Sequence, residues 1–329
     1  MNAQLSDPGQ SGDIMVTAPQ RLNIGHLAFA ILPPLFWAGN FFLARAFRDD
    51  IPPFQMSFWR WLIAFFLLLP FVLPKLRQNR DRLRREWLWL SALGIVGVTA
   101  FNCFIYVALH HTTVVNAALI NSLMPVMTLV FAYIFLRVRI AGLQVLGVAL
   151  ALTGAVVIIA RGNVHILSAL APQYGDILVF LGMSAWALYT VLIRWKPTAL
   201  DPLVFLLTTI GFGVLGHMPI AVWEAAVVGT MTVSAGSLLA LVYFAIFPSL
   251  LAYIFWNRAV RSIGPARASL FMYLMPLFAA GLAIIFLNES LQAYHVFGMA
   301  IIVAGLTMSM RASAPAPAKG LPDRQPQRG

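Results

Sequence analysis

Residues 37–45 read Trp-Ala-Gly-Asn-Phe-Phe-Leu-Ala-Arg, and residues 186–194 read Trp-Ala-Leu-Tyr-Thr-Val-Leu-Ile-Arg. The tryptophans, the alanines that follow them and the closing arginines coincide at a spacing of 149 residues. Leu-Met-Pro at 123–125 returns as Leu-Met-Pro at 274–276, at a spacing of 151 residues. Self-similarity at a nearly fixed spacing indicates a structural repeat. The sequence therefore predicts two similar halves.

A stripe of small residues supports the same spacing. Gly147 pairs with Gly298 and Gly154 with Gly305, again 151 residues apart. Gly147, Ala151 and Gly154 form a stripe of small residues on one face of the fifth span. Small residues let helices approach closely in a membrane. The stripe predicts packing within the scaffold, with the seam of a homodimer as the alternative.

The composition places both halves in a membrane. Of 329 residues, 60% are hydrophobic and only 10% are charged, and the mean hydropathy is +0.84. A soluble domain is about 45–50% apolar and about 25% charged, so a soluble enzyme is excluded. The net charge of +11 is typical of the basic cytoplasmic loops of membrane proteins, and no nucleic-acid partner is predicted from it. The single cysteine, Cys103, excludes an intrachain disulfide.

Ten apolar windows are long enough to cross a bilayer, which takes about 20 residues. Helices 1–5 make a first repeat at 26–161, and helices 6–10 make a second at 175–310. The flanking segments are a cytoplasmic tail at 1–25 and a disordered cytoplasmic tail, rich in Pro, Ala, Arg and Lys, at 311–329. The windows are 26–44, 54–74, 87–109, 112–136, 140–160, 176–193, 202–223, 235–257, 268–288 and 291–310.

Basic residues set the expected orientation. If the N-terminus lies inside, most of the 22 lysines and arginines fall in cytoplasmic segments, so both termini are predicted to be cytoplasmic. Five spans per repeat is an odd number, so the second repeat enters the membrane upside down. Inverted repeats around a site near the midplane are typical of secondary transporters. The predicted fold is an all-α integral membrane protein with ten transmembrane helices as two inverted five-helix repeats.

Several motifs together resemble one family. They are Trp37-Ala-Gly-Asn40 followed by Arg45, Arg60 within Phe-Trp-Arg-Trp-Leu-Ile-Ala, the Leu-Met-Pro of both halves, and Phe286-Leu287-Asn288-Glu289-Ser290-Leu291. In order and spacing they resemble the EamA family of ten-helix permeases in the drug/metabolite transporter superfamily. The resemblance implies export or exchange of small metabolites, such as amino acids or related compounds, across the inner membrane. It also implies that helices 5 and 10 lie at the periphery.

The chain departs from the family pattern at one position. The family often carries a glutamate after Phe-Leu-x in both repeats, whereas the first repeat here reads Phe135-Leu136-Arg137-Val138. A mechanism that needs a symmetric pair of carboxylates is therefore not expected for this chain.

Polar and aromatic groups inside the spans are the candidate substrate-binding residues. Asn102 and Tyr106 of the third span correspond to Tyr253 and Asn257 of the eighth, so amide and phenol groups recur in both halves. Polar groups in hydrocarbon are costly unless they face protein or water. Such residues line a substrate cavity or, as the alternative, join helices by hydrogen bonds.

A second candidate group lies in the middle of the first and sixth spans. Trp37 and Asn40 share one helix face, and Trp186 and Tyr189 share the matching face of the sixth span. An aromatic wall with a few hydrogen-bond donors suits a zwitterionic or partly apolar ligand. Tryptophans of an interfacial belt are the alternative, although belt residues gather at span ends.

Five further residues have candidate charge, proton or gating roles. Arg60 lies about two turns inside its span, where it either snorkels outward or binds a substrate carboxylate. His217 and Glu289 are the candidates for a proton route, although no acid lies at mid-span and a substrate gradient is the expected driving force. Pro125 and Pro276 interrupt their spans as gating points or as static bends.

Two other functions fit the sequence less well. Nucleotide-sugar or sugar-phosphate antiport requires more basic residues in the cavity than the spans supply. An intramembrane enzyme requires paired acids or a histidine-rich metal set, and the chain has no P-loop, GxGxxG or HExxH motif. No enzymatic activity, catalytic residue, metal site or cofactor is predicted. The expected partners are a small-molecule substrate and the lipid bilayer.

Overall fold

The computed structural model describes residues 24–47, 50–287 and 290–312, and in these ranges all regular secondary structure is helical. The first half comprises α1 (Ile24–Ala46), α2 (Pro53–Gln78), α3 (Arg80–Gly94), η1 (Ile95–Ala100), α4 (Phe101–Leu109), α5 (Val114–Asn121), α6 (Met124–Leu136) and α7 (Gly142–Ile159). The second comprises α8 (Val164–Ser168), α9 (Tyr174–Trp195), α10 (Pro202–Val227), α11 (Ala235–Phe244), η2 (Ala245–Leu251), α12 (Ala252–Ile263), α13 (Pro265–Leu270), η3 (Phe271–Leu274), α14 (Met275–Leu287) and α15 (Ala293–Ala312).

Nine segments of the described chain are long and apolar enough to cross a membrane, and α1 holds a shorter apolar stretch, Leu27–Asn40. Each predicted window coincides with one of these passages, so the all-α membrane fold is confirmed. The windows that contain Arg60 and His217 are the 26-residue helices α2 and α10. The two predicted tails lie almost entirely outside the described residues.

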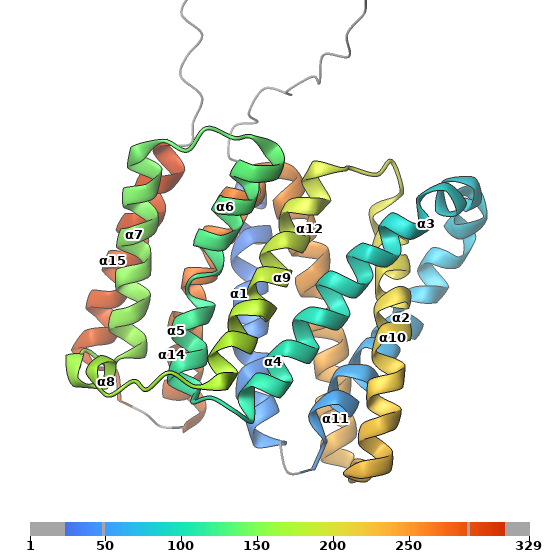
Figure 1. Cartoon of the computed structure of the whole chain (residues 1–329), viewed down its shortest axis with the longest axis horizontal. Coiled ribbons are helices and arrows are strands. Elements are labelled where there is room, and N and C mark those ends of the chain that lie inside the picture. The colour runs from blue at the N-terminus through green and yellow to red at the C-terminus, as the bar shows by residue number, and fades with distance from the viewer. Residues whose placement is uncertain (1–23, 48–49, 288–289, 313–329) are drawn as a thin grey trace, which may run out of the picture.

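The two repeats run in opposite directions. α1 begins at the upper face in Figure 1, where α15 ends, and we call this the terminal face. α1 runs from the terminal face to the opposite face, whereas its repeat counterpart α9 runs from the opposite face to the terminal face (Figure 1). The predicted inversion is therefore present.

Both repeats interrupt their helices at matching places. The third and eighth passages contain π-helical turns, η1 and η2, at repeat-related positions. π-Helical turns are rare and often lie at functional sites. The fourth passage breaks between α5 and α6, and the ninth contains the 3₁₀ turn η3.

The two predicted kink prolines lie at these breaks. Pro125 and Pro276 are the second residues of α6 and α14. Proline is tolerated in the first turn of a helix, where its missing N–H costs least. Each proline thus lies where the hydrogen-bonding pattern of its passage changes, and its role as a gating point or as a static bend stays a prediction.

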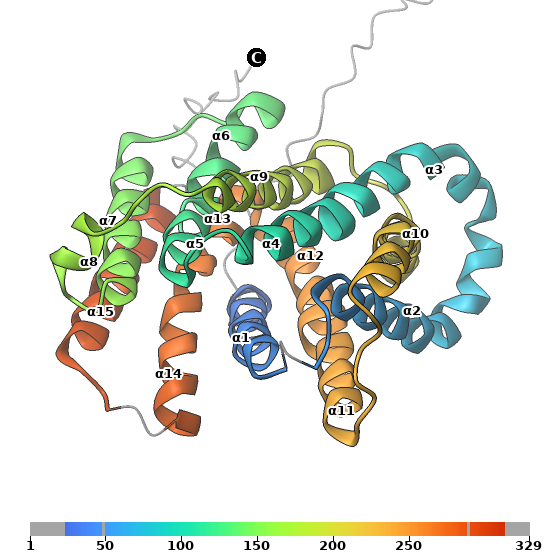
Figure 2. The ribbon, with the colours of Figure 1, turned by 60° about the horizontal axis from the view of Figure 1, so that its bottom comes forward.

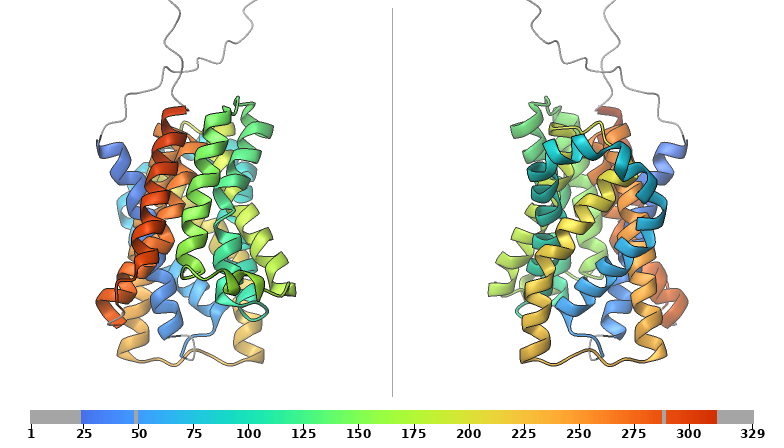
Figure 3. Two further views of the ribbon diagram at one scale, coloured as in Figure 1. Left: turned by 90° about the vertical axis from the view of Figure 1, so that its left-hand side faces the viewer. Right: turned by 90° about the vertical axis from the view of Figure 1, so that its right-hand side faces the viewer.

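α1 and α12 lie in the middle of the molecule, whereas α7 and α15 form one edge and α2, α3 and α10 the other (Figure 2). α7 and α15 run side by side (Figure 3, left), as implied for helices 5 and 10. A Cβ atom on Gly154 would lie 2.7 Å from the Gly298 carbonyl oxygen, and one on Gly147 would lie 2.6 Å from the Ser309 nitrogen. The small-residue stripe therefore lies at the contact between α7 and α15, where it lets the two helices approach closely.

α2 and α10 are tied together at both ends. At the terminal face, Lys75 Nζ donates to Asp201 Oδ2 at 2.7 Å, and this hydrogen bond holds the pKa of the Asp201 carboxyl below its usual value. At the opposite face, Glu224 Oε2 accepts from the Gln55 backbone nitrogen at 2.8 Å. A carboxylate at the first turn of α2 is favoured by the helix dipole. These contacts hold α2 and α10 together beside the central helices α1 and α12.

Candidate substrate cavity

A cavity of about 60 Å³ lies between the two repeats. This space holds only a few water molecules and is too small for a metabolite. The lining residues come from both repeats and are Trp37, Asn40, Ala44, Arg60, Phe101, Asn102, Ile105, Tyr106, Asn121, Met183, Trp186, Tyr253, Met272 and Met275.

Four aromatic rings from both repeats meet at one side of the cavity, and we call them the aromatic layer: Trp37, Trp186, Tyr253 and Trp256. The Trp37 ring centroid lies 5.2 Å from that of Trp186 and 5.5 Å from that of Trp256. Trp186 and Tyr253 lie 5.1 Å apart. Most of these contacts are edge-to-face, which the ring quadrupoles favour. The layer joins α1, α9 and α12 across the repeat interface.

The cavity lies on the opposite-face side of the aromatic layer. Along α1, Asn40 and Ala44 follow Trp37 toward the opposite face, and both line the cavity. On the terminal-face side of the aromatic layer, described residues of α9 and α12 contact each other directly and leave no cavity between them. There the Tyr189 hydroxyl donates to Asn257 Oδ1 at 3.2 Å.

The eight predicted binding residues therefore divide into two groups. Six line the cavity: Trp37, Asn40, Asn102, Tyr106, Trp186 and Tyr253. Tyr189 and Asn257 lie beyond the aromatic layer and bind each other. The Tyr253 hydroxyl itself donates to the Gly97 carbonyl oxygen of η1 at 2.8 Å, which joins the eighth passage to the third.

Arg60 is the charged member of the cavity wall. Its side chain is 4% exposed, so it does not snorkel outward, and that alternative is wrong. Nη1 donates to Asn40 Oδ1 at 3.1 Å and Nη2 to Asn102 Oδ1 at 2.6 Å. Nε is buried without a hydrogen-bond partner. Among the described residues, no carboxylate lies within 4.0 Å of the guanidinium.

This arrangement leaves the guanidinium incompletely paired. Arginine has five N–H donors, of which the two asparagine oxygens take two. A buried cation without a counter-ion costs several kcal/mol. The amide oxygens offset part of that cost, and an anion entering the cavity would supply the missing charge. The fork of N–H groups suits a carboxylate in particular.

The other candidate charged residues lie elsewhere. His217 is fully buried between α2 and α10, where Nδ1 lies 3.0 Å from the Gly213 carbonyl oxygen and Nε2 lies 3.0 Å from Ser57 Oγ. A carbonyl oxygen only accepts, so Nδ1 carries the proton and Nε2 accepts from the serine. His217 does not line the cavity, and its proton role stays a prediction. Glu289 lies outside the described residues.

The sequence did not single out the apolar part of the wall. Met183, Met272 and Met275 line the cavity, and Asn121 lies at the end of α5. Methionines in an apolar chain carry no signal of their own, although the repeated Leu-Met-Pro marks the break beside Met275. Flexible thioethers let a surface adapt to ligands of different shape.

Two inverted helical repeats around an interior cavity define a secondary transporter. The sequence model of the EamA-like transporter family matches residues 24–160 and again residues 173–311. The chain belongs to the EamA-like transporter family, within the drug/metabolite transporter superfamily.

Similar proteins are transporters as well. The uncharacterized transporter YyaM of Bacillus subtilis is 28% identical over 272 residues, which cover 83% of this chain and 89% of YyaM. The uncharacterized inner membrane transporter YedA of Escherichia coli is 26% identical over 275 residues, covering 83% of this chain and 87% of YedA. A solved crystal structure matches with a TM-score of 0.70 over 86% of this chain and 96% of the other, and at 19% identity this likeness shows the fold alone. The protein is thus a multi-pass membrane transporter.

Proposed function

We propose that the protein exports or exchanges small metabolites that carry a carboxylate, such as amino acids or related compounds, across the inner membrane. The observation that carries this proposal is Arg60, a buried guanidinium in the cavity between the repeats, whose Nε has no hydrogen-bond partner and which has no carboxylate beside it among the described residues. The aromatic layer beside it suits the apolar part of such a molecule. Transport proceeds by alternating access, driven by the substrate's own gradient or by counter-exchange.

The proposed orientation has both termini in the cytoplasm. The turn between α2 and α3 lies at the terminal face, and a dense run of basic residues from Lys75 to Arg85 lies in the helix ends on both sides of it. Basic loops favour the cytoplasmic side. In this orientation the cavity lies toward the periplasm, and the aromatic layer closes the way to the cytoplasm.

Repeat symmetry suggests how the other state forms. Tyr189 corresponds to Asn40 at the spacing of 149, and Asn257 corresponds to Tyr106 at the spacing of 151. The Tyr189–Asn257 pair is bonded, whereas Asn40 and Tyr106 both line the cavity. When inverted repeats exchange conformations, related contacts exchange too. We infer that an Asn40–Tyr106 contact closes the periplasmic side as the Tyr189–Asn257 contact opens.

A second pair of related contacts has the same asymmetry. Trp37 Nε1 donates to the Pro248 carbonyl oxygen at 3.0 Å. The corresponding Trp186 Nε1 is buried without a partner. The related acceptor, the Gly97 carbonyl oxygen, is taken by Tyr253. Release of Tyr253 would free this oxygen for Trp186, so the two tryptophans are placed to exchange roles between the states.

Removing one phenol is therefore expected to shift the balance between states. Tyr189→Phe deletes a contact of the present state. It should shift the equilibrium away from the state open to the periplasm by about threefold to thirtyfold, since such bonds contribute about 0.6–2 kcal/mol in membranes. Tyr106→Phe should raise that population or leave it unchanged. The measurement is the alkylation rate of Asn121→Cys, in a Cys103→Ser background, by an impermeant maleimide added to intact cells. Equal changes of the same sign in both variants would contradict the exchange of gates.

The transport proposal itself is tested in proteoliposomes. Vesicles loaded with an unlabelled amino-acid mixture should take up labelled amino acids in exchange, and empty vesicles should take up less. Replacing the carboxylate with a carboxamide should abolish uptake, because the amide has no charge to pair with Arg60. Uptake only of solutes that lack a carboxylate would overturn the proposal.

Nucleotide-sugar or sugar-phosphate antiport is the second candidate. Among the described residues that line the cavity, Arg60 is the only lysine or arginine, and one guanidinium suits a single carboxylate better than a pyrophosphate. The same vesicles offered a labelled nucleotide sugar distinguish the two, since exclusive uptake of that compound would select the antiporter. An intramembrane enzyme is the least supported alternative, because the family and the relatives are transporters.

A further inference from the structure

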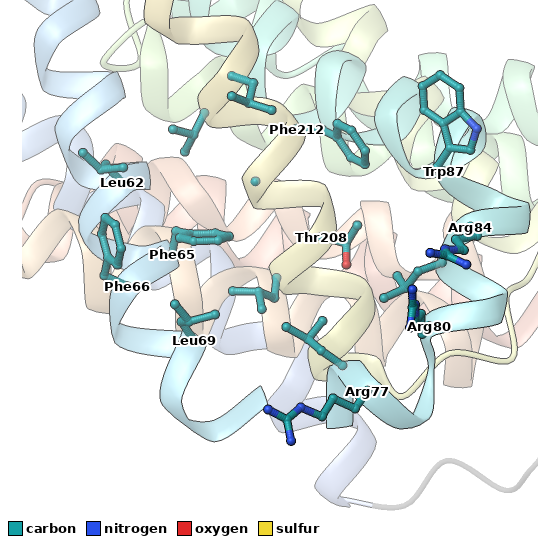
Figure 4. A pocket seen from close by; sticks show the side chains of 16 residues that line it. Leu62, Phe65, Phe66, Leu69, Arg77, Arg80, Arg84, Trp87, Thr208 and Phe212 are labelled. Carbon is teal, nitrogen blue, oxygen red and sulfur yellow. The ribbon is translucent and has the colours of Figure 1, made fainter. Parts of the chain in front are cut away.

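A second, larger groove lies on the outer surface, between α2, α3 and α10. Its volume is about 950 Å³. α2 and α3 diverge from their short turn and pass on either side of α10, which forms the floor (Figure 2). Figure 4 shows phenylalanines of α2 on one side, Thr208 and Phe212 of α10 in the middle, and Trp87 of α3 on the other side. The groove is separate from the central cavity, with which it shares no lining residue.

The groove has the length of one membrane leaflet. Its α2 wall extends from Leu62 to Leu76, which is about 21 Å at 1.5 Å per residue. One half of the hydrocarbon core is about 15 Å thick, so the wall spans it and reaches the headgroup layer. Phe66 and Leu215 are each 59% exposed on its surface. Apolar side chains exposed at this depth face acyl chains.

Three arginines, Arg77, Arg80 and Arg84, line the groove where α2 turns into α3 (Figure 4). All three are exposed, and the described residues provide no ion pair or hydrogen bond to their guanidinium groups. Their neighbour Lys75 differs, because it binds Asp201. Trp87 is 52% exposed beside them, as an indole at the headgroup level would be.

We propose that this groove binds an anionic phospholipid, with its phosphate at the three arginines and an acyl chain along α10. The complementarity is in two parts. The free guanidinium groups match a phosphate, and basic pockets between transmembrane helices are suited to acidic headgroups. The apolar floor matches the chain that follows the headgroup. A free phosphate would meet only the first part, so the groove selects the lipid. This site does not depend on what the central cavity transports.

The test uses the purified full-length protein in detergent and native mass spectrometry with phosphatidylglycerol or phosphatidylcholine of identical acyl chains. The wild-type protein should bind phosphatidylglycerol roughly tenfold or more tightly than phosphatidylcholine. The triple variant R77Q/R80Q/R84Q should lose this preference. The matched control R85Q/R137Q/R139Q removes three exposed charges from the same face, outside the groove, and should keep it.

Two further measurements separate the headgroup from the chain. Thr208→Phe fills the floor without changing charge, so it should weaken both lipids alike. Inorganic phosphate at millimolar concentration should not displace phosphatidylglycerol. The proposal is overturned if the control triple loses the preference as fully as the groove triple, if the wild type does not discriminate between the lipids, or if phosphate displaces the lipid completely.

Discussion

Replacing Arg60 with methionine is expected to lower transport of carboxylate substrates by roughly tenfold to a hundredfold. Hydrogen bonds to charged groups contribute about 1.5–3 kcal/mol, and each 1.4 kcal/mol corresponds to a factor of ten. Methionine keeps the unbranched apolar stem of the side chain and removes a buried charge, so the protein should still fold and insert. The measurement is exchange in proteoliposomes, normalised to the amount of protein that elutes as one species in gel filtration.

The preference for a carboxylate over a carboxamide shows whether Arg60 binds substrate or only stabilises the structure. The wild-type protein should prefer an amino acid over its carboxamide, whereas Arg60→Met should lose this preference. Arg60→Lys keeps the charge but not the bidentate fork, so it should retain part of it. Arg139→Met, at an exposed arginine outside the cavity, is the control. If Arg60→Met transports less but still prefers the carboxylate, Arg60 acts on the scaffold and the binding assignment fails.

The fold could be predicted because its signals are long and repeated. Each apolar window of about 20 residues marks one passage through the membrane. The repeat contains an odd number of these windows, so its second copy must be inverted relative to the first. Local detail was less accessible. The π-helical turns depend on contacts between the passages, such as the bond from Tyr253 to Gly97, which single-span periodicity does not contain. The prolines marked positions in the fourth and ninth passages but did not show that the hydrogen-bonding pattern changes there.

The site could be predicted only in part, and the missing part has a physical reason. Helix periodicity gives the face on which Asn102 or Tyr189 lies, but not the conformational state of the transporter. Tyr189 and Asn257 lie outside the cavity because this state closes on them. Arg60 could be assigned to the interior only once Asn40 and Asn102 were seen beside it, since a guanidinium snorkels unless such partners hold it.

The close contact between α7 and α15 leads to a second prediction with a large effect. Gly154→Ala is expected to lower the free energy of unfolding by about 1–3 kcal/mol, the usual cost of overpacking. The added methyl would lie 2.7 Å from the Gly298 carbonyl oxygen and 2.8 Å from the Ile302 nitrogen. Both are backbone atoms of α15, so no side-chain rotation relieves the contact and the helices have to separate. This loss outweighs the gain of about 1 kcal/mol that alanine brings to a helix interior.

Gly142→Ala is the matched control, because it lies on the same helix and its added Cβ would meet no atom within 4 Å. Thermal unfolding in detergent should show a lower midpoint for Gly154→Ala and an unchanged or higher one for Gly142→Ala. Since α7 and α15 lie at the edge of the molecule, the folded fraction of Gly154→Ala should keep the substrate preference of the wild type. Equal midpoints for the two variants would mean that α7 and α15 do not approach as closely as their glycines allow. A changed substrate preference would instead mean that α7 and α15 influence the cavity. These two helices would then belong to the transport pathway and not only to the scaffold.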